Sequence, residues 1–389
     1  MNNFTYHAPT NVIFGRNTHK QVGDIIKGYG YDRIMLQYGK NSIKASGLYD
    51  EIMQSLRDSG ITVVEMGGVQ PNPTVEFVRS AIAVAREHKV QLVLAVGGGS
   101  VIDSAKCTAV GVPYEGDEWD FHCGKATPKA ALPVGCVLTL AAAGSEMSAS
   151  AVLTNTELNS KRGFGSQFNR CLFSICNPEL TYTVSPYQTA CGIVDSMAHT
   201  MERYFTVCPP TDLTDQMAEG VLRALINAGR TLLTDPQNYE ARANMMWGSS
   251  LSHNGLTGCF REQALAVHQL EHALSGEYEH IAHGAGLAVL FPAWARYIYP
   301  HNIPRFAQFA RRVWEVTEAD DKVAAEEGIR RMADYFAELG MPTRLRDFAI
   351  PESCIPRLAE LCSFGRTRAV KSYIPMDYNV VKDIFEACY

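Results

Sequence analysis

The first half of the chain alternates between short apolar runs and amphipathic segments. An apolar run that begins at Arg33 is followed by a helical pattern, and a second strand begins at Ile61. The spacing predicts a helix over 74–88, a strand over 91–96 and another buried strand over 132–140. Strands that alternate with helices favour a parallel sheet that helices cover on both faces.

The alternation stops near Pro178, and the rest of the chain shows long helical periodicities. The first of these helices has a clear start, because Ser185 suits the N-cap position and Gln188 completes a capping box three residues later. We therefore predict two domains, an α/β domain over residues 1–183 and an all-α domain over 184–389. A cleft between two such domains is the usual place for a ligand.

Length and composition agree with two folded domains. The 389 residues suit two domains of ordinary size, and 46% hydrophobic with 20% charged residues is a usual globular balance. The net charge of -6 offers no electrostatic attraction to nucleic acid or to an anionic membrane, so neither is an expected partner. The sequence shows neither a secretory leader nor an apolar stretch of about 18 residues, so a soluble, cytoplasmic protein is expected.

The eleven cysteines are scattered between Cys107 and Cys388 and include no C-x-x-C pair. An odd number of cysteines cannot all pair within one chain, so reduced thiols are expected. The pattern therefore implies neither a disulfide framework nor a zinc site of the cysteine type.

A glycine-rich turn follows the strand that ends at Val96. In Gly97–Ser100, three glycines let backbone N–H groups approach a pyrophosphate, and the helix that follows favours its negative charge. The alternative is a tight strand-to-helix turn without a ligand. Asp103 and Lys106 lie one helical turn apart, where they either orient this loop or form a surface pair. Neither G-x-G-x-x-G nor G-x-x-x-x-G-K-[ST] occurs, which disfavours an ordinary Rossmann or P-loop domain.

The first predicted strand ends in a turn without an acidic residue. An acid at this position accepts hydrogen bonds from the ribose 2′-hydroxyl of NAD, whereas Gly39, Lys40 and Ser42 offer small, cationic and hydroxyl groups. That chemistry favours the 2′-phosphate of NADP. The alternative is a solvated turn without a ligand.

Histidine spacing points to a metal site. Four of the eleven histidines fall within sixteen residues: His268, His272, His280 and His283. On a helix, His268 and His272 share one face, as do Asp195 and His199 on the helix that begins near Ser185. One carboxylate and three imidazoles suit zinc or ferrous iron and leave a position open for a substrate oxygen. The alternative for Asp195 and His199 is hydrogen bonding within the helical core.

Four segments resemble the iron-containing (group III) alcohol dehydrogenase family. They are GGGSVIDSAK at 97–106, GSE at 144–146, GIVDSMAHTMERYF at 192–205 and HQLEHALSGEYEHIAHG at 268–284. QPNPT at 70–74 and YEGDEWDF at 114–121 resemble its branch of butanol dehydrogenases and NADPH-dependent aldehyde reductases. The resemblance implies a dehydroquinate-synthase-like fold with a dinucleotide-binding α/β domain and a helical metal-binding domain. It also implies that metal and nicotinamide meet in the cleft.

The resemblance implies roles for particular residues. The metal ligands would be Asp195, His199, His268 and His283, and His272 would lie near the nicotinamide, where it relays a proton. Gly97, Gly98, Gly99, Ser100 and Asp103 would form the pyrophosphate loop. Asn72 and Pro73 would contact the adenosine side of the cofactor, Thr139 and Leu140 the nicotinamide side, and Lys161 the ribose. No role follows for His280.

The chain departs from the family pattern at two places. Many NADP-using relatives carry a run of glycines where this chain has Gly39–Ser42, so the expected preference for NADP(H) over NAD(H) is weakened but not overturned. Residues 141–143 are alanines in place of hydroxyl-bearing residues beside the nicotinamide, and hydride transfer does not require those hydroxyls.

The resemblance predicts a metal-dependent oxidoreductase that interconverts aldehydes and primary alcohols by hydride transfer with NADP(H). One Fe²⁺ or Zn²⁺ per chain and a homodimer are expected. Trp119 and Phe121 favour less polar substrates if they line the pocket, and they are ordinary core aromatics otherwise.

Three other functions remain open. An NAD-dependent polyol dehydrogenase of the glycerol type belongs to the same superfamily. A lyase of the dehydroquinate synthase type needs cations for a phosphorylated, carboxylated substrate, and the metal-site segments supply only Arg203 and Arg261. A non-catalytic dinucleotide-binding or assembly protein would have no chemical need for the four metal ligands.

Overall fold

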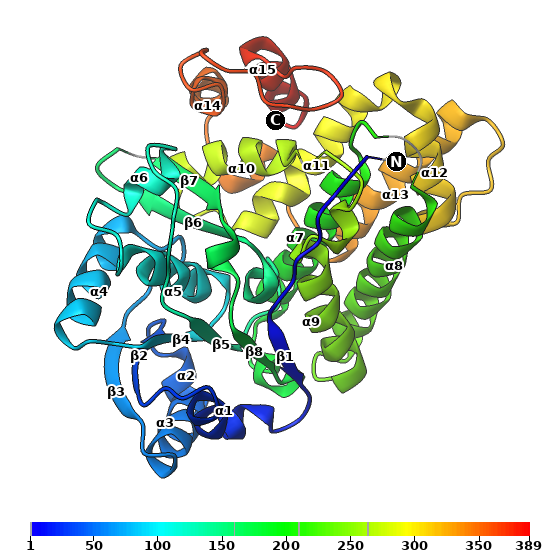
Figure 1. The fold of residues 1–389 in the computed structure, drawn as a ribbon. Coiled ribbons are helices and arrows are strands. Elements are labelled where there is room, and N and C mark those ends of the chain that lie inside the picture. The colour runs from blue at the N-terminus through cyan, green and yellow to red at the C-terminus, as the bar shows by residue number, and fades with distance from the viewer. Residues whose placement is uncertain (1, 159, 209–210, 263) are drawn as a thin grey trace. The chain divides into compact units, whose positions relative to one another are not determined.

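The protein is described from a computed structural model that covers residues 2–158, 160–208, 211–262 and 264–389. It divides into two compact units, His7–Val184 and Ser185–Tyr389, and the N-terminal segment that ends at Tyr6 belongs with the second unit. In that segment the ring of Phe4 lies 4.3 Å from the ring of Phe260. The first unit combines a parallel sheet with helices and the second is helical, so the expected fold class is confirmed (Figure 1).

The first unit is built on a six-stranded parallel sheet in the order β1-β8-β5-β4-β2-β3. Its strands are β1 (Asn11–Phe14), β2 (Arg33–Tyr38), β3 (Thr62–Gly67), β4 (Leu92–Gly97), β5 (Val134–Leu138) and β8 (Phe173–Cys176). A separate antiparallel pair consists of β6 (Ser150–Asn155) and β7 (Ser160–Gly165). The central strands β4 and β5 are buried along their whole length, as expected for a sheet that is covered on both faces.

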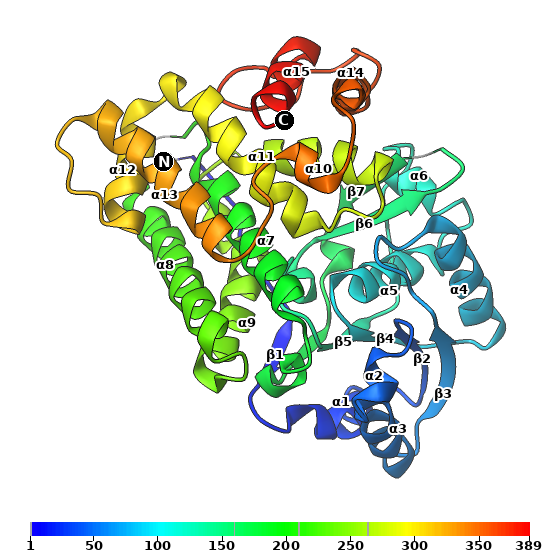
Figure 2. The same cartoon turned by 180° about the vertical axis from the view of Figure 1, so that it is seen from behind.

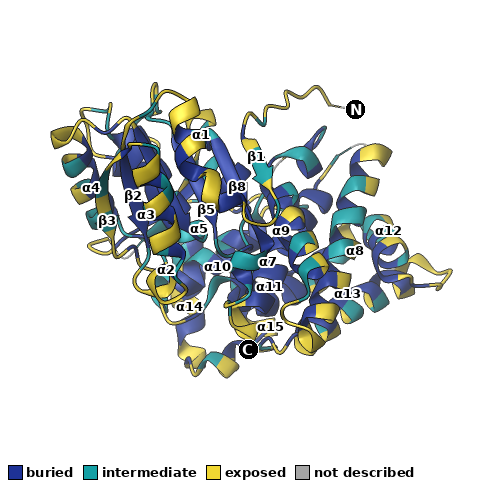
Figure 3. Ribbon diagram, turned by 90° about the horizontal axis from the view of Figure 1, so that it is seen from below, coloured by how far each residue is buried: buried dark blue, intermediate teal, exposed yellow. Residues whose placement is uncertain are grey.

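Helices lie on both faces of this sheet, as Figures 1 and 2 show. They are α1 (Val22–Gly28), α2 (Ser42–Ala45), α3 (Leu48–Asp58), α4 (Val75–Glu87), α5 (Gly99–Gly111) and α6 (Trp119–His122). The amphipathic helix α3 buries its apolar positions Leu48, Ile52 and Leu56, which recur at helical spacing, and its other positions stay more accessible (Figure 3). By contrast, nearly every residue of α5 is buried, so α5 lies inside the unit.

The sheet register brings three loops together. Tyr38 of β2 pairs with Val96 of β4, and Gly97 of β4 pairs with Leu138 of β5. Because the strands are parallel, the loops that follow β2, β4 and β5 leave the same edge of the sheet. The carboxyl ends of these strands are the usual place for a nucleotide in an open α/β sheet.

The second unit is formed by nine helices in the part of the chain that the structure describes. They are α7 (Pro186–Tyr204), α8 (Asp212–Thr234), α9 (Tyr239–His253), α10 (Ala266–Glu277), α11 (His283–Ile298), α12 (Ile303–Trp314), α13 (Asp321–Glu338), α14 (Ile355–Cys362) and α15 (Tyr378–Ala387). The predicted start of α7 is confirmed, because the Ser185 hydroxyl accepts a hydrogen bond from the Gln188 N–H at 3.2 Å. None of the described helices combines the length and the apolarity that crossing a bilayer requires.

A glycine lets the start of α11 approach α7. A Cβ atom added to Gly284 would lie 2.2 Å from the carbonyl oxygen of Cys191, which is far inside van der Waals contact. Any side chain at this position would therefore push the two helices apart. Gly284 directly follows His283, so this close packing also places the His283 side chain against α7.

Replacing Gly284 with Ala should destabilise the protein by about 1–3 kcal/mol, the usual cost of forcing an extra atom into a packed contact. Gly220 in the middle of α8 is the matched control, because an added Cβ there meets no atom within 4 Å. Gly220→Ala should leave stability unchanged or raise it by up to about 1 kcal/mol, since alanine favours helix. Chemical denaturation measures both variants, and equal stability of the two would contradict the packing argument.

Candidate active site

The glycine turn of the first unit lies against the end of β5. Helix α5 begins at Gly99 directly after β4, so the unpaired N–H groups of its first turn, which includes Ser100, are available to an anion. A Cβ atom at Gly98 would lie 3.1 Å from the Cβ of Leu140, and the Thr139 N–H donates to the Gly97 carbonyl at 3.0 Å. The structure thus brings the turn together with Thr139 and Leu140.

Asp103 and Lys106 order the segment that follows β5. The Asp103 carboxylate accepts hydrogen bonds from the Ser145 hydroxyl at 2.6 Å and from the Val152 N–H at 3.0 Å. The fully buried Lys106 amine donates to the Ser145 carbonyl at 2.6 Å and to the Ser150 carbonyl at 3.0 Å. Burial raises the pKa of Asp103, although the Lys106 charge opposes this shift. The two residues therefore orient the loop and do not form a surface pair.

The other predicted cofactor residues also lie in the first unit. Gly39–Ser42 follow β2, next to the glycine turn by the sheet register. Asn72 adopts a left-handed backbone conformation with φ 56°, and the Pro73 carbonyl accepts a hydrogen bond from the Thr154 N–H at 2.9 Å. Lys161 lies on β7, paired with Thr154 of β6. The Asn72–Pro73 turn and Lys161 are therefore both tied to β6.

Donor atoms of Asp195, His199 and His268 lie within 4.8 Å of one another, and His283 faces the same carboxylate. Asp195 and His199 come from α7, His268 from α10, and His283 is the first residue of α11. The Oδ1 atom of Asp195 lies 3.0 Å from Nδ1 of His199, 3.5 Å from Nε2 of His268 and 3.8 Å from Nε2 of His283. The four side chains that are candidate ligands thus come from three helices and face one carboxylate.

Two buried glutamates hold the outer nitrogens of these histidines. The Nδ1 atom of His268 bonds to Glu202, and Nδ1 of His283 bonds to Glu271. A histidine that binds a metal usually donates its second N–H to a carboxylate, which fixes the ring and makes the ligand nitrogen more basic. The arrangement therefore leaves Nε2 of His268 and of His283 directed toward Asp195.

Sequence reasoning missed these two glutamates, although their spacing carried a signal. Glu202 lies three residues after His199, and Glu271 three residues after His268. On a helix such pairs share a face, so this spacing could have placed each glutamate near the candidate ligands. Nothing in the sequence indicated which histidine each glutamate would contact.

The residues fit a divalent metal ion. Among the described residues, Asp195 Oδ1 and His268 Nε2 are buried and have no hydrogen-bond partner. Such unpaired atoms are costly inside a protein, and a cation held between them would satisfy both. A carboxylate with imidazole nitrogens is a donor set that zinc and ferrous iron accept.

Burial and the carboxylates dominate the electrostatics of this group of side chains. Burial alone would raise the pKa of Asp195, but His199, His268 and His283 hold it well below the usual value. Burial and then the charge of His268 lower the pKa of His199 to about 3. Against the effect of burial, Glu202 and Asp195 raise the pKa of His268 to about 9. A metal ion at this site would therefore displace a proton from His268.

The remaining two histidines of the cluster occupy different surroundings. His272 is half-buried on α10, with its ring 5.6 Å from that of His283 and 6.4 Å from that of His268. His280 is exposed, and its Nε2 atom lies 3.3 Å from the Phe348 carbonyl oxygen. Thus His272 lies beside the ligand group, whereas the polar contact of His280 is outside it.

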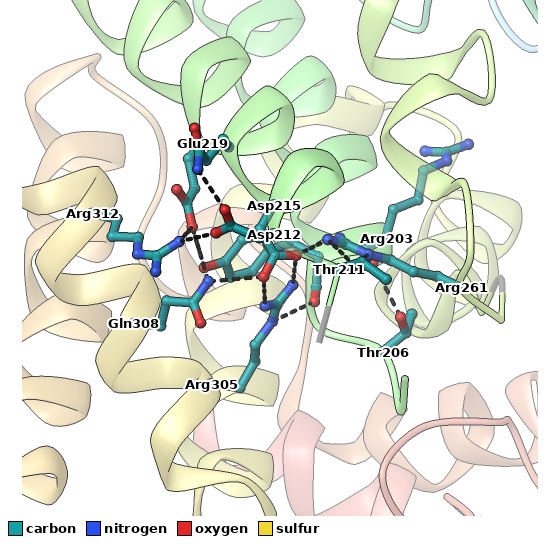
Figure 4. Close-up of polar contacts among 12 residues, drawn as sticks. Arg203, Thr206, Thr211, Asp212, Asp215, Glu219, Arg261, Arg305, Gln308 and Arg312 are labelled. Atoms are coloured by element: carbon teal, nitrogen blue, oxygen red, sulfur yellow. Dashed lines mark hydrogen bonds and ion pairs between the residues drawn. The ribbon is translucent and has the colours of Figure 1, made fainter. Parts of the chain in front are cut away.

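Two arginines near the site are used in internal contacts (Figure 4). Arg203 donates to the His199 carbonyl at 2.6 Å and lies 3.0 Å from Nδ1 of His253. Arg261 bonds to the Asp215 carboxylate and donates to the Arg203 carbonyl at 3.1 Å. Both guanidinium groups are thus committed to this network, which leaves little support for a lyase that would use them to bind a phosphorylated substrate.

The aromatic residues Trp119 and Phe121 lie in the core of the first unit. They are 6% and 4% exposed, and Trp119 packs with Val78 and Leu153 in an apolar cluster. They are ordinary core aromatics, so they carry no information about substrate polarity.

Comparisons with known proteins match nearly the whole chain. The model of iron-containing alcohol dehydrogenase matches residues 9–178, and that of the C-terminal part of the Fe-containing alcohol dehydrogenase family matches 189–389. The probable NADH-dependent butanol dehydrogenase 1 of Bacillus subtilis is 42% identical over 92% of this chain and 93% of its own. The NADPH-dependent aldehyde reductase YqhD of Escherichia coli is 36% identical over 100% of both chains. The crystal structure of NADH-dependent butanol dehydrogenase A from Thermotoga maritima superimposes with a TM-score of 0.96 at 37% identity, covering 100% of this chain and 99% of that chain.

Replacing Glu202 with Gln should weaken Zn²⁺ binding about 10- to 100-fold, because the carboxylate no longer orients His268 or increases its basicity. Glu279→Gln, a change of the same kind at an exposed position, is the control and should leave the affinity unchanged. Competition of each purified variant with a chelating dye measures the dissociation constant. Equal affinities would show that the Glu202 contact does not tune the site.

Proposed function

Because this chain belongs to the iron-containing alcohol dehydrogenase family, we propose that it interconverts aldehydes and primary alcohols by hydride transfer with NADP(H). It is an NAD(P)-dependent, metal-dependent alcohol dehydrogenase. The proposal is carried by the convergence of Asp195, His199, His268 and His283, which is a ligand set for one divalent ion. A non-catalytic protein would have no use for that arrangement.

In the proposed reaction the four ligands hold the ion, and the protein positions and protonates the substrate oxygen. A divalent ion supplies Lewis acidity there, which stabilises negative charge on that oxygen. Glu202 and Glu271 would keep the imidazoles of His268 and His283 oriented toward the ion. His272, beside His283, moves a proton between the substrate oxygen and solvent, because an imidazole titrates near neutral pH.

The preference for NADP(H) over NAD(H) rests on the loop after β2. No acidic residue lies in Gly39–Ser42 to accept a bond from a ribose 2′-hydroxyl, and the exposed Lys40 is suited to a 2′-phosphate. The Escherichia coli relative is named for NADPH and the Bacillus subtilis relative for NADH, so the family admits both cofactors. We propose that Gly97–Ser100 with Asp103 form the pyrophosphate loop, Asn72 and Pro73 the adenosine side, Thr139 and Leu140 the nicotinamide side, and Lys161 the ribose contact.

Other features of the proposal stay predictions. The donor set accepts Fe²⁺ and Zn²⁺ alike, so one ion of either kind is expected at the Asp195 ligand group. We also predict that the protein forms a homodimer and is cytoplasmic. Residues 1–183 are expected to bind the dinucleotide, and residues 184–389 the metal.

Metal-loaded protein should oxidise NADPH faster than NADH in the presence of butanal, and chelation should abolish both rates because the substrate oxygen loses its Lewis acid. Absorbance of the reduced nicotinamide measures the rates. Activity with diols or glycerol but not with butanal would favour a polyol dehydrogenase. No turnover on any aldehyde or alcohol, with the metal verified at the site, would contradict the proposal.

A Lys40→Asp variant tests the cofactor contact, and its ratio of NADPH to NADH activity should fall if Lys40 faces the 2′-phosphate.

Replacing His272 with Ala should lower kcat while the metal ion at the Asp195 group stays bound, because the proton relay is lost and the ligands are intact. The size of the loss is expected to be about 10²-fold or more, as for other general acid-base groups. His280→Ala in the same segment is the control and should keep the wild-type rate. Steady-state kinetics with metal analysis of each variant would refute the relay if His272→Ala turned over like the control.

A further inference from the structure

A second buried cluster of metal-binding side chain types lies in the first unit. It consists of Cys107 on α5, Glu118 just before α6, and His122 at the end of α6. The Nε2 atom of His122 lies 3.0 Å from Oε1 of Glu118 and 3.8 Å from Sγ of Cys107. The three donor atoms all lie within 4.8 Å of one another.

The hydrogen bonding of His122 turns its Nε2 atom toward this cluster. Its Nδ1 atom lies 2.7 Å from the Arg162 carbonyl oxygen, and a carbonyl can only accept, so Nδ1 donates to it. Nε2 therefore faces Glu118 and Cys107. This is the pattern of a metal-bound histidine, whose outer nitrogen donates to a carbonyl or carboxylate.

The surroundings make this cluster costly without a cation. The side chains of Glu118 and His122 are 0% exposed, and among the described residues Oε2 of Glu118 has no hydrogen-bond partner. Aromatic rings enclose the imidazole, with Trp119 stacked at 5.0 Å and Phe164 edge-on at 4.8 Å. An unpaired carboxylate oxygen in such an apolar setting is unfavourable unless a positive charge lies beside it.

We propose that Cys107, Glu118 and His122 bind a second metal ion, and that this ion is Zn²⁺. Zinc bonds of about 2.3 Å to sulfur and about 2.0–2.2 Å to nitrogen and oxygen, at tetrahedral angles, put sulfur about 3.6 Å and oxygen about 3.4 Å from the imidazole nitrogen. The observed separations of 3.8 Å and 3.0 Å differ from these by only about 0.2–0.4 Å. The unpaired Oε2 of Glu118 is available as a further contact to the ion.

Charge balance also favours a dication. Binding of Zn²⁺ to this cluster releases the Cys107 thiol proton to solvent and leaves a thiolate, a carboxylate and a dication, whose charges sum to zero. A neutral assembly is the form that an apolar core accepts most readily.

This second site is independent of the proposed active site. Cys107 lies eight residues after Gly99 on α5, which is about 12 Å along the helix from the glycine turn. The ligand group at Asp195 contains oxygen and nitrogen donors only, whereas the second cluster supplies sulfur. Of these two groups, only the second can give a thiolate signal, whatever the outcome for alcohol dehydrogenase activity.

Cobalt(II) is the probe, because it occupies zinc sites and shows a thiolate-to-metal charge-transfer band. The full-length protein, stripped of metal under native conditions and titrated with Co²⁺, should bind two ions per chain and develop this band. Cys107→Ala should bind one ion and lose the band. Cys388→Ala, which removes a different buried cysteine, is the control and should keep both the stoichiometry and the band.

Either of two results would overturn the proposal: no thiolate-to-metal band in the Co²⁺-loaded wild type, or an unchanged band in Cys107→Ala. If Cys107→Ala fails to fold, as far-ultraviolet circular dichroism would reveal, X-ray absorption of the zinc-loaded wild type decides. A sulfur neighbour at about 2.3 Å supports the site, and a shell of nitrogen and oxygen alone leaves Glu118 and His122 as a metal-free ion pair.

Discussion

The helical unit depends on a buried carboxylate that has to be surrounded by positive or proton-donating groups. Asp195 is 4% exposed, and three helices direct imidazoles at its Oδ1 atom. Helix α11 can deliver its imidazole only because Gly284 permits backbone contact with α7. The positions of the candidate ligands therefore depend on the packing of these helices. A change that separates the helices also separates the imidazoles from Asp195.

Buried polar anchors play a comparable part in the α/β unit. The Lys106 amine is enclosed by oxygen atoms of Ser145, Ser148 and Ser150, and it secures the segment that follows β5. Lys106 lies on α5, which also begins at the glycine turn. One helix therefore positions both the glycine turn and the segment that follows β5.

The two clusters of metal-binding residues share a design but differ in chemistry. In each cluster, the Nδ1 atom of a histidine contacts a carboxylate or a carbonyl oxygen, as in His268 and His122. The Nε2 atom of the same ring then faces the other candidate metal ligands. The group at Asp195 offers hard and borderline donors and includes a half-buried histidine, His283, which suits an ion that exchanges substrate. The group at Cys107 is sealed by aromatic rings, which suits an ion with a structural role.

The sequence by itself determined everything that acts within a few residues. Alternation of strand and helix, the cap at Ser185 and the pairing of Asp195 with His199 on one helical face depend on local spacing, and the structure has all three. The four-residue edge strand β1 and its neighbour β8 were not predicted, because so short a run carries too little periodicity to separate from a loop.

Only the tertiary structure decided which distant groups meet. The contact between Glu202 and His268 joins residues 66 positions apart, and no local pattern specifies such a pair. The sequence likewise suggested no cysteine-containing metal site, because Cys107 comes from a different helix than Glu118 and His122. Periodicity and capping act over one or two turns, whereas these contacts arise from the packing of whole helices, which a single sequence does not reveal.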